Sequence, residues 1–483
     1  MHHAFDLAVV GGGLAGLTAA NRCAEAGLSV AVLERGEAAD YRCNSRFAMG
    51  FMTVARENLC SEPEVLRRAI RTLCQGEQNQ ELSEVLVNNA ARAFDWFRNQ
   101  GVRTVQFGGA LFPGRRVLLV PPPALRPGLH WPGRGADSMM RRMAERLSRN
   151  TGRLLLGMRA SDLILERGRC VGVNAQQAGC RHAFRATAVL IADGGFQANH
   201  DLVRRYISPR PERLLQRNAG TGTGDGLQMG KAAGAVLNGM DRFYGHVQSR
   251  DAMSNPRLWP YPTVDFPIAA GIAVDAQGRR FADEGLGGIY MANAIAALGD
   301  PLEATAIFDS AIWEGRARTF LVPSNPNLER AGATIHRAAS LKELAGLAGL
   351  PADNLTDTVE RFNAAVANGT TRQLVPTRTS SPLEPARIGT PPFYAVPLCA
   401  GITYTMGGLA IDSRCRVKHR DGGIIEGLFA AGAAAGGLEG GRTAAYMGGL
   451  SKALIQGFVA AEEISAQAQN ARTRSQSLEG QMT

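Results

Sequence analysis

Three glycines near the start of the chain constrain its fold more than any other feature. Gly11, Gly13 and Gly16 stand between a short apolar run and a helix-like segment. In such a turn the first glycine allows the tight bend, the second lets the backbone approach a pyrophosphate, and the third lets helix and strand pack. Glu34 ends the next buried run, where an acid accepts hydrogen bonds from ribose hydroxyls. The spacing predicts a βαβ unit that binds a dinucleotide.

The position of this motif favours FAD over NAD. The glycines lie at the extreme N-terminus, and a second glycine-rich strand and turn, residues 427–432, recurs hundreds of residues later. A bound NAD would leave that distant segment unexplained. We therefore expect FAD, with Gly432 among the residues that contact it.

Composition and charge exclude several classes of protein. The chain of 483 residues carries 53 Lys and Arg against 43 Asp and Glu, a formal net charge of +10. Arginine pairs are spread along the chain rather than gathered in a block, so we expect an anionic ligand and no nucleic acid. The eight cysteines form no C-x-x-C pair, which argues for reduced thiols and against a metal. No run reaches the ~18 apolar residues of a membrane helix. With no signal-peptide pattern, the default is a cytoplasmic protein without a membrane span.

The order of strands, glycine turns and polar segments predicts an α/β fold with an insertion. We divide the chain into the first part of a dinucleotide-binding domain, an inserted domain with proline-rich loops, the second part of the first domain, and a polar, frayed tail: residues 1–240, 241–395, 396–465 and 466–483. The patterns predict buried strands at 5–10, 29–34 and 188–195, and helices at 17–27, 137–150, 341–350, 354–368 and 448–464.

Motifs along nearly the whole chain resemble the fumarate reductase/succinate dehydrogenase flavoprotein superfamily. Beside the N-terminal glycines, the resemblance rests on residues 44–46, 49–50, 224–227, 240–241, 246, 278–284, 405–408, 427–432 and 448–449. It implies a Rossmann-like FAD-binding domain of the GR2 type, interrupted by an inserted α+β capping domain. The substrate would lie between the two domains, and a hydride would pass between flavin N5 and a carbon next to an activated one.

The resemblance also implies which residues hold the cofactor. Asn44, Ser45, Met49 and Gly50 would run past the phosphates and the flavin, Asp225 would bind FAD, and Ser451 would lie at the flavin end of the last helix. The full expected set is Gly11, Gly13, Leu14, Ala15, Gly16, Glu34, Arg35, Asn44, Ser45, Met49, Gly50, Ala160, Ala192, Asp193, Gly194, Asp225, Gly432, Gly449 and Ser451. The histidine of the covalent flavin signature is absent from residues 44–46, so FAD should be bound noncovalently. Arg46 could pair with a phosphate or with substrate.

The chain departs from the superfamily where fumarate reductases carry their proton donor and its relay. Alignment on residues 280–284 places Val264 and Pro267 at the relay positions and Gly288 at the position of the donor arginine. Thr403 replaces the usual carboxylate-binding histidine, and Tyr446 stands where an arginine is usual. A site without the proton-donor arginine but with tyrosines nearby resembles the 3-ketosteroid dehydrogenase branch, with tricarballylate dehydrogenases also similar. It implies α,β-dehydrogenation.

In that chemistry, hydrogen-bond donors polarise a carbonyl and a base removes the α proton. We predict that Tyr404 and the backbone N–H of Gly408 donate to the carbonyl, and that Tyr290 is the base. His246 keeps the place of a substrate-binding histidine. Either Arg442 or Tyr446 would take the carboxylate-binding place. The substrate would be a small carbonyl or carboxylate compound.

Two other readings stay open. The chain could be an enoate reductase fed by an external donor, or a flavin-carrying electron-transfer subunit without activity of its own. It carries no iron–sulfur or haem motif. Electrons would therefore pass to an unidentified acceptor, such as a partner protein, a quinone or a diffusible carrier.

Overall fold

The computed structural model describes residues 2–109, 112–120, 126–150 and 152–479. Its strands are β1 (His2–Val10), β2 (Val30–Glu34), β3 (Phe51–Val54), β4 (Glu57–Asn58), β5 (Val105–Gly109), β6 (Phe112–Leu119), β7 (Gly152–Leu156), β8 (Arg159–Glu166), β9 (Arg169–Gln177), β10 (Cys180–Ile191), β11 (Leu215–Gln216), β12 (Leu237–Asn238), β13 (Phe243–Ser249), β14 (Ile272–Val274), β15 (Thr305–Asp309), β16 (His336–Ala338), β17 (Phe393–Thr405), β18 (Gly408–Ala410), β19 (Arg416–Lys418), β20 (Ile424–Ala430) and β21 (Ala435–Gly436). Its α-helices are α1 (Leu14–Glu25), α2 (Asn44–Phe47), α3 (Pro63–Leu73), α4 (Gln80–Asn99), α5 (Ala136–Arg149), α6 (His200–Tyr206), α7 (Asp225–Ala232), α8 (Asp265–Ala270), α9 (Gly288–Ala296), α10 (Ser310–Glu314), α11 (Ser324–Ala331), α12 (Leu341–Ala348), α13 (Ala352–Ala367) and α14 (Gly449–Glu479).

A parallel sheet forms the centre of what we call the main domain. Its parallel strands run in the order β20, β10, β1, β2, β7, and β19 pairs antiparallel to β20 at one edge. Residues 7–10 of β1 and all of β2 are buried, as expected for parallel strands covered on both faces. Strands at each of the three predicted positions are present, so the predicted α/β class and Rossmann-like core are confirmed.

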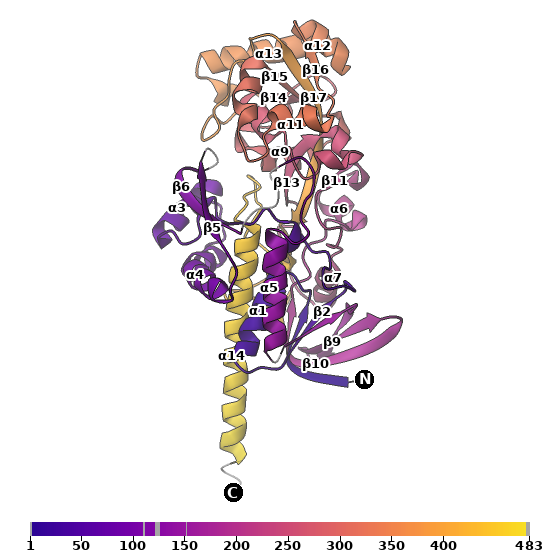
Figure 1. The fold of residues 1–483 in the computed structure, drawn as a ribbon, viewed down its shortest axis with the longest axis vertical. Helices are drawn as coiled ribbons and strands as arrows, with labels where there is room; N and C mark the ends of the chain where they lie inside the picture. The colour runs from indigo at the N-terminus through magenta and orange to yellow at the C-terminus, as the bar shows by residue number, and fades with distance from the viewer. Residues whose placement is uncertain (1, 110–111, 121–125, 151, 480–483) are drawn as a thin grey trace.

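Helices α1 and α14 pack side by side against this sheet (Figure 1). The two helices approach closely because Gly457 has no side chain: a Cβ there would lie 2.5 Å from the carbonyl oxygen of Ala15. The prediction of a frayed tail after residue 465 is wrong, since α14 continues to Glu479. Alanine and glutamine, both good helix formers, supply much of that extension.

The second part of the molecule, which we call the cap, lies at the top of Figure 1. It contains a sheet in which β17 pairs with β11, β13, β15 and β16, and helices α8 to α13 surround that sheet. Strand β17 is 13 residues long and returns the chain from the cap to the main domain. Its last residues, Thr403 to Thr405, therefore reach the junction between the two parts.

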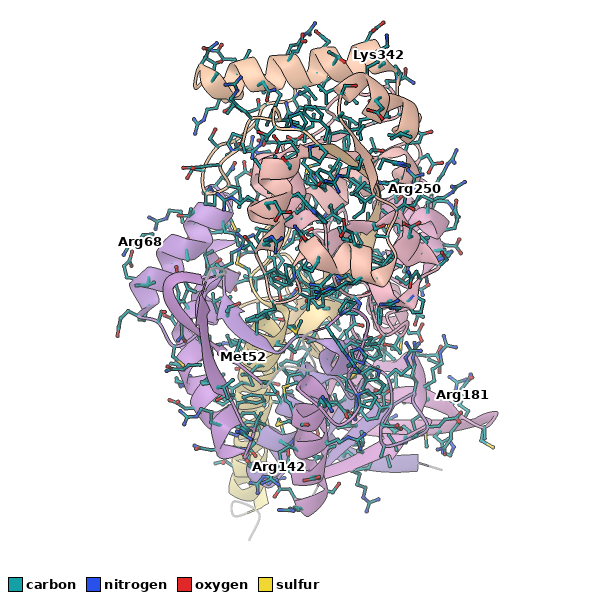
Figure 2. All side chains as sticks on the ribbon, turned by 45° about the horizontal axis from the view of Figure 1, so that its top comes forward. Met52, Arg68, Arg142, Arg181, Arg250 and Lys342 are labelled. Carbon is teal, nitrogen blue, oxygen red and sulfur yellow. The ribbon has the colours of Figure 1, made fainter. Side chains whose placement is uncertain are left out.

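Basic side chains are distributed over both parts of the molecule. Figure 2 shows Arg68 on α3, Arg142 on α5, Arg181 on β10, Arg250 after β13 and Lys342 on α12. Within the described ranges, no helix combines the length and the apolar character needed to cross a lipid bilayer.

Candidate active site

One cavity extends from the N-terminal glycine turn to the junction with the cap. Its volume is about 1200 Å³, above the ~300–1,000 Å³ of most small-molecule pockets. It can therefore hold a dinucleotide together with a second molecule. Of the residues predicted to bind the cofactor, those in the lining are Gly11, Gly13, Leu14, Ala15, Glu34, Arg35, Asn44, Ser45, Met49, Gly50, Ala160, Ala192, Asp193, Gly194, Asp225, Gly432 and Gly449.

The glycine turn leaves room for a ligand against the first turn of α1. Gly11 has a φ of +101°, and a Cβ there would lie 2.6 Å from the Cα of Asp193. A Cβ on Gly16 would lie 2.1 Å from the carbonyl oxygen of Gly11. A Cβ on Gly13 would meet nothing closer than the Oγ of Ser45, at 3.6 Å, and would point into the cavity. Gly11 and Gly16 thus permit the packing, and Gly13 keeps the phosphate space open.

Glu34 stands at the end of β2 with both carboxylate oxygens anchored. Gly12 N–H donates to Oε2 at 2.9 Å, and Gly36 N–H donates to Oε1 at 2.8 Å. Burial raises the pKa of Glu34, while the two backbone donors act in the opposite direction. Each oxygen keeps a further lone pair, so this fixed carboxyl group suits the two hydroxyls of a ribose. The cradle therefore fits an adenine dinucleotide.

Two aspartates line the same end of the cavity. Asp193 follows β10, accepts a hydrogen bond from Gly226 N–H at 2.7 Å, and burial raises its pKa to about 7. Asp225 opens α7 and is paired with Arg159 at 2.9 Å. Thr223 also donates to Asp225 and accepts from Arg35, which links these lining side chains into one network.

Helix α2 lies against the glycine turn. The Ser45 hydroxyl accepts from Leu14 N–H at 3.0 Å, so its own hydrogen is free for a ligand. Asn44 bridges Thr403 and Ala219 at 2.9 Å each. Arg46 does not face the cavity: its guanidinium binds the buried carboxylate of Asp137, and this pair fixes α2 against α5.

Gly13→Val should separate loss of the cofactor from loss of the fold. Gly13 has φ −72° and ψ 179°, which valine can adopt, and the new side chain would occupy only the phosphate space. We expect FAD to bind about 10- to 100-fold more weakly, or ~1.4–2.7 kcal/mol, when apoprotein is titrated with FAD. Gly16→Ala should instead lower the free energy of unfolding by about 1–3 kcal/mol. Gly346→Ala, in open space on α12, is the control, and it should change neither the affinity for FAD nor the free energy of unfolding in the way these variants do.

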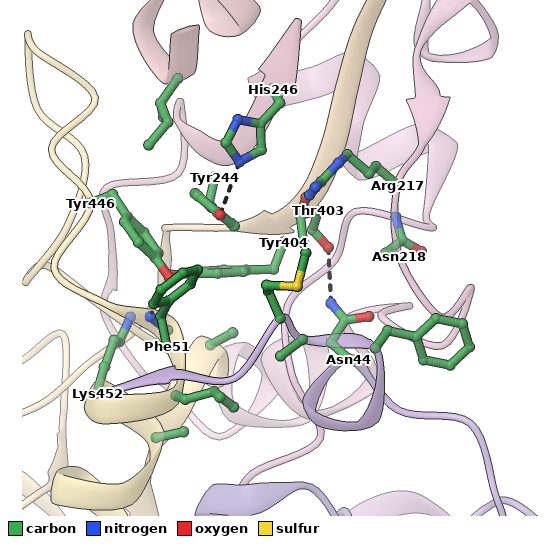
Figure 3. Close-up of a pocket in the computed structure, with 18 of the residues that line it drawn as sticks. Asn44, Phe51, Arg217, Asn218, Tyr244, His246, Thr403, Tyr404, Tyr446 and Lys452 are labelled. Carbon is green, nitrogen blue, oxygen red and sulfur yellow. Dashed lines mark hydrogen bonds between the residues drawn. The ribbon is translucent and has the colours of Figure 1, made fainter. Parts of the chain in front are cut away.

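Three tyrosines gather where the cavity meets the cap (Figure 3). Tyr244 and Tyr446 stack with ring centroids 4.0 Å apart and planes at 15°, and Tyr404 lies 5.4 Å from Tyr244. Burial raises the pKa of all three well above the ordinary value of a tyrosine, so all three are protonated at neutral pH. The Tyr446 hydroxyl oxygen accepts from Gly449 N–H at 2.9 Å, which orients its hydrogen.

A chain of hydrogen bonds connects Tyr244 to a carboxylate in the cap. Residues alternate along β13, so Tyr244 and His246 face the cavity together. The Tyr244 hydroxyl lies 3.0 Å from Nε2 of His246, and Nδ1 of the same ring is bonded to Oδ2 of Asp265. Because Asp265 can only accept there, we place the ring hydrogen on Nδ1, which leaves Nε2 as a proton acceptor. The pKa of His246 is lowered, chiefly by burial, so the ring is neutral.

Gly288 makes room for this arrangement. A Cβ on Gly288 would lie 2.1 Å from Cγ of Asp265. At the position where an arginine donor is missing, the absent side chain thus leaves the space that the Asp265 carboxylate fills.

Tyr404 lines the cavity, but its hydroxyl is already engaged. It lies 3.1 Å from both carboxylate oxygens of Glu439, which also pairs with Lys452 at 3.1 Å. The three groups are buried, and a phenol has one hydrogen to donate. The Tyr404 hydrogen thus goes to Glu439, which argues against the predicted donation to a substrate carbonyl. Tyr446 lines the cavity beside Tyr244, with which it shares a side-chain hydrogen bond.

Other predicted site residues lie outside the described lining. Tyr290 follows Ile289 on α9, and because successive helical residues point ~100° apart, Ile289 reaches the cavity while Tyr290 packs on the core. Arg442 is directed outward, where it contacts Gln75 at 3.2 Å. Its side chain is 70% exposed, so the expectation that it faces the site is wrong.

Three further predicted residues, Gly408, Gly16 and Ser451, are absent from the cavity lining. Gly408 is held between β12 and β21 in a small sheet, so its N–H does not reach the cavity. Gly16 acts through helix packing rather than by contact with the cavity. Ser451 is fully buried, and its Oγ has no hydrogen-bond partner among the described residues.

Sequence reasoning missed polar groups at the site, among them Arg217, Tyr244, Asp265, Glu439 and Lys452. For Tyr244 a signal existed in its position two residues before His246, but no strand was predicted there, and the structure places both residues on β13. Asp265 and Glu439 lie in segments without a periodic pattern, and only the fold brings them to the tyrosines.

Comparisons with known proteins agree with this geometry. The model of the FAD binding domain family matches residues 6–445. An NADH:acrylate oxidoreductase of Vibrio harveyi is 30% identical over 370 residues, 75% of this chain and 34% of that one. A fumarate reductase (cytochrome) of Shewanella frigidimarina is 25% identical over 474 residues, 96% of this chain and 77% of that one. The structure of a 3-ketosteroid-Δ4-(5α)-dehydrogenase from Rhodococcus jostii shares the fold, with a TM-score of 0.70 and 23% identity over 96% of this chain and 97% of that one.

Proposed function

Because the chain belongs to the FAD binding domain family, we propose that it is an FAD-dependent α,β-dehydrogenase of a small ketone, keto acid or polycarboxylate. Membership in this family confirms the predicted superfamily and FAD as the cofactor. The glycine cradle and Glu34 fit the adenine dinucleotide, and we propose that it is held noncovalently. The chain spans about a third of the Vibrio harveyi relative, so its activity as a whole protein is part of this proposal.

The observation that carries the proposal is the chain from Tyr244 through His246 to Asp265. A tyrosine with a raised pKa is a poor base alone, but it can accept a proton from carbon while its own hydrogen passes to Nε2 of His246. Asp265 then stabilises the charged imidazole through Nδ1, the logic that also operates in a serine protease triad.

Tyr446 supplies the second requirement of this chemistry. Its oxygen is held by Gly449 N–H, so its hydrogen can point to a substrate carbonyl or carboxylate oxygen and stabilise the negative charge that develops there. FAD, when bound, supplies the acceptor for the hydride that leaves the β carbon. The α proton goes to Tyr244, and the product gains a C=C bond.

An enoate reductase is the second candidate, because one observation favours it. Tyr244 and Tyr446 both carry their hydrogens at neutral pH, which also suits proton donation to the α carbon. The same residues then act in reverse, and the direction depends on the electron partner. That partner is unidentified, and a flavin subunit that only passes electrons is the remaining alternative.

Anaerobic bleaching of the flavin absorbance tests the proposal. We expect cyclohexanone, levulinate or tricarballylate to bleach the oxidised holoenzyme, with one class clearly fastest. If none bleaches it, and dithionite-reduced enzyme is reoxidised by cyclohexenone or fumarate, the reductase direction holds. If neither reaction occurs, the activity at a carbon–carbon bond is refuted.

A further inference from the structure

Arg217 is a buried cation without a counter-ion. It follows β11, lines the cavity, and is only 6% exposed. Its Nε donates to the Pro260 carbonyl at 3.1 Å and its Nη1 donates to Thr403 Oγ1 at 2.9 Å. In the described ranges it forms no ion pair with any carboxylate. A buried, unpaired charge is costly, so its presence beside a cavity calls for an anionic ligand.

The location of Arg217 relates it to the reacting groups. It contacts Thr403, the residue that stands where a carboxylate-binding histidine was expected (Figure 3). Its charge also opposes the protonation of His246. Other arginines line the same cavity, among them Arg56 and Arg316, but both are exposed to solvent, whereas Arg217 is buried. Arg217 is thus a buried cation of the lining whose charge no carboxylate of the described residues neutralises.

An aromatic wall continues from Arg217 along the cavity. The guanidinium lies 4.9 Å from the ring centroid of Tyr261, which packs on Phe320 at 5.4 Å, and Phe320 packs on Phe266 at 5.8 Å. All three rings belong to the lining. Phe320 has a φ of +111°, an unusual value for a bulky residue that persists only where the surroundings enforce it. The fold thus holds this ring in the cavity at a conformational cost.

We infer that the substrate is a monocarboxylic acid with a bulky apolar body. Its carboxylate binds Arg217, and its body lies on the aromatic wall of Tyr261, Phe320 and Phe266. A second carboxylate would face these rings, and an uncharged ketone would leave Arg217 unpaired. The inference keeps the proposed reaction but replaces the ketone and polycarboxylate substrates by a monocarboxylic acid. It rests on the proposed function for the reaction, but not for binding.

In this reaction the carboxylate bound by Arg217 would be the group that activates the neighbouring α carbon–hydrogen bond. The α carbon–hydrogen bond breaks and its proton goes to Tyr244, while the β hydrogen leaves as a hydride to bound FAD. Two electrons pass to FAD, and the acid becomes an α,β-unsaturated acid. Arg217 lies where it can neutralise the charge that develops on the carboxylate.

Binding of three matched probes to oxidised holoenzyme tests the inference. The probes are 3-phenylpropanoate, succinate, which lacks the apolar body, and 4-phenylbutan-2-one, which lacks the charge. We expect 3-phenylpropanoate to perturb the flavin spectrum with a dissociation constant at least ~30-fold lower than either of the others. If succinate bound equally well, the requirement for an apolar body would be refuted. If the ketone bound equally well, the role of Arg217 as carboxylate anchor would be refuted.

Variants then assign the two contacts. Arg217→Gln should weaken 3-phenylpropanoate at least ~30-fold and leave the ketone unchanged, with Arg217→Lys retaining part of the affinity. Phe320→Ala should weaken both phenyl compounds and spare succinate. The matched control is Arg337→Gln, since Arg337 lies 5.6 Å from the Tyr394 ring but outside the lining. FAD content per protein verifies folding of each variant.

The two proposals fail in different ways. If a ketone bleaches the flavin while Arg217→Gln leaves acid binding unchanged, the anchor is refuted and the dehydrogenase stands. If the acid binds through Arg217 but no compound bleaches or reoxidises the flavin, the binding site stands and the reaction is refuted.

Discussion

Tyr244→Phe is expected to lower the rate constant for flavin reduction by about 100- to 10,000-fold, the usual contribution of a positioned proton-transfer group. The variant keeps the ring that stacks on Tyr446 and removes only the hydroxyl that contacts His246. Affinity for the bleaching compound should change less than ~10-fold, because the hydroxyl acts in the transition state. Stopped-flow reduction over a range of concentrations separates the two effects.

Two other tyrosines provide the comparison. Tyr394 stacks on Phe308 in the cap. Tyr394→Phe should therefore leave both the rate constant for flavin reduction and the affinity for the bleaching compound unchanged. Tyr404→Phe should act mainly on stability, because it leaves the Glu439 carboxylate with one donor fewer. If Tyr404→Phe lowered the rate more than Tyr244→Phe, the assignment of the proton acceptor to Tyr244 would be refuted.

The cofactor half of the site was largely predictable from the sequence. The glycine turn and Glu34 follow a fixed local geometry in which each residue type has its own steric or hydrogen-bonding requirement. Most of the residues carried over for the cofactor line the cavity for the same reason. Exceptions such as Gly16 and Ser451 affect packing around the cavity rather than its surface.

The catalytic half was much less predictable, because its groups meet across long sequence separations. The sequence indicates that position 288 lacks an arginine, but not that Asp265 fills the space. It also indicates tyrosines near a carbonyl site, yet whether a hydroxyl is free depends on neighbours such as Glu439. The rotation of α9 turns Tyr290 toward the core instead of the cavity, and the course of an irregular loop directs Arg442 away from the site.

The glycine at position 288 and the carboxylate at position 265 are thus two parts of one substitution. A cationic donor at 288 would collide with Asp265, and with Asp265 in place the cavity instead contains a neutral histidine and its tyrosine. A protonated tyrosine exchanges a proton with carbon only if the next group can receive or return one. The carboxylate behind His246 is therefore what makes Tyr244 usable.

Asp265→Asn is accordingly expected to lower the rate of flavin reduction about 100- to 10,000-fold and to change its pH dependence in a specific direction. In the unmodified protein the rate needs neutral His246, so it falls as the pH drops through the lowered pKa of that ring. Burial lowers this pKa, and the charges of Arg217 and Arg56 add to the effect, whereas Asp265 opposes it. Without the carboxylate the acid limb should move to still lower pH.

This combination of a lower plateau and a more acidic limb distinguishes a proton relay from a disturbed structure. A variant that merely opened the cap would hydrate His246 and move the limb upward, toward the ordinary pKa of about 6.5. Gly288→Ala is the matched steric test, because its Cβ displaces Asp265 without removing the charge. It should lower the plateau with a smaller shift of the limb. An Asp265→Asn profile with an unchanged plateau would show that the proton of the substrate leaves by another route.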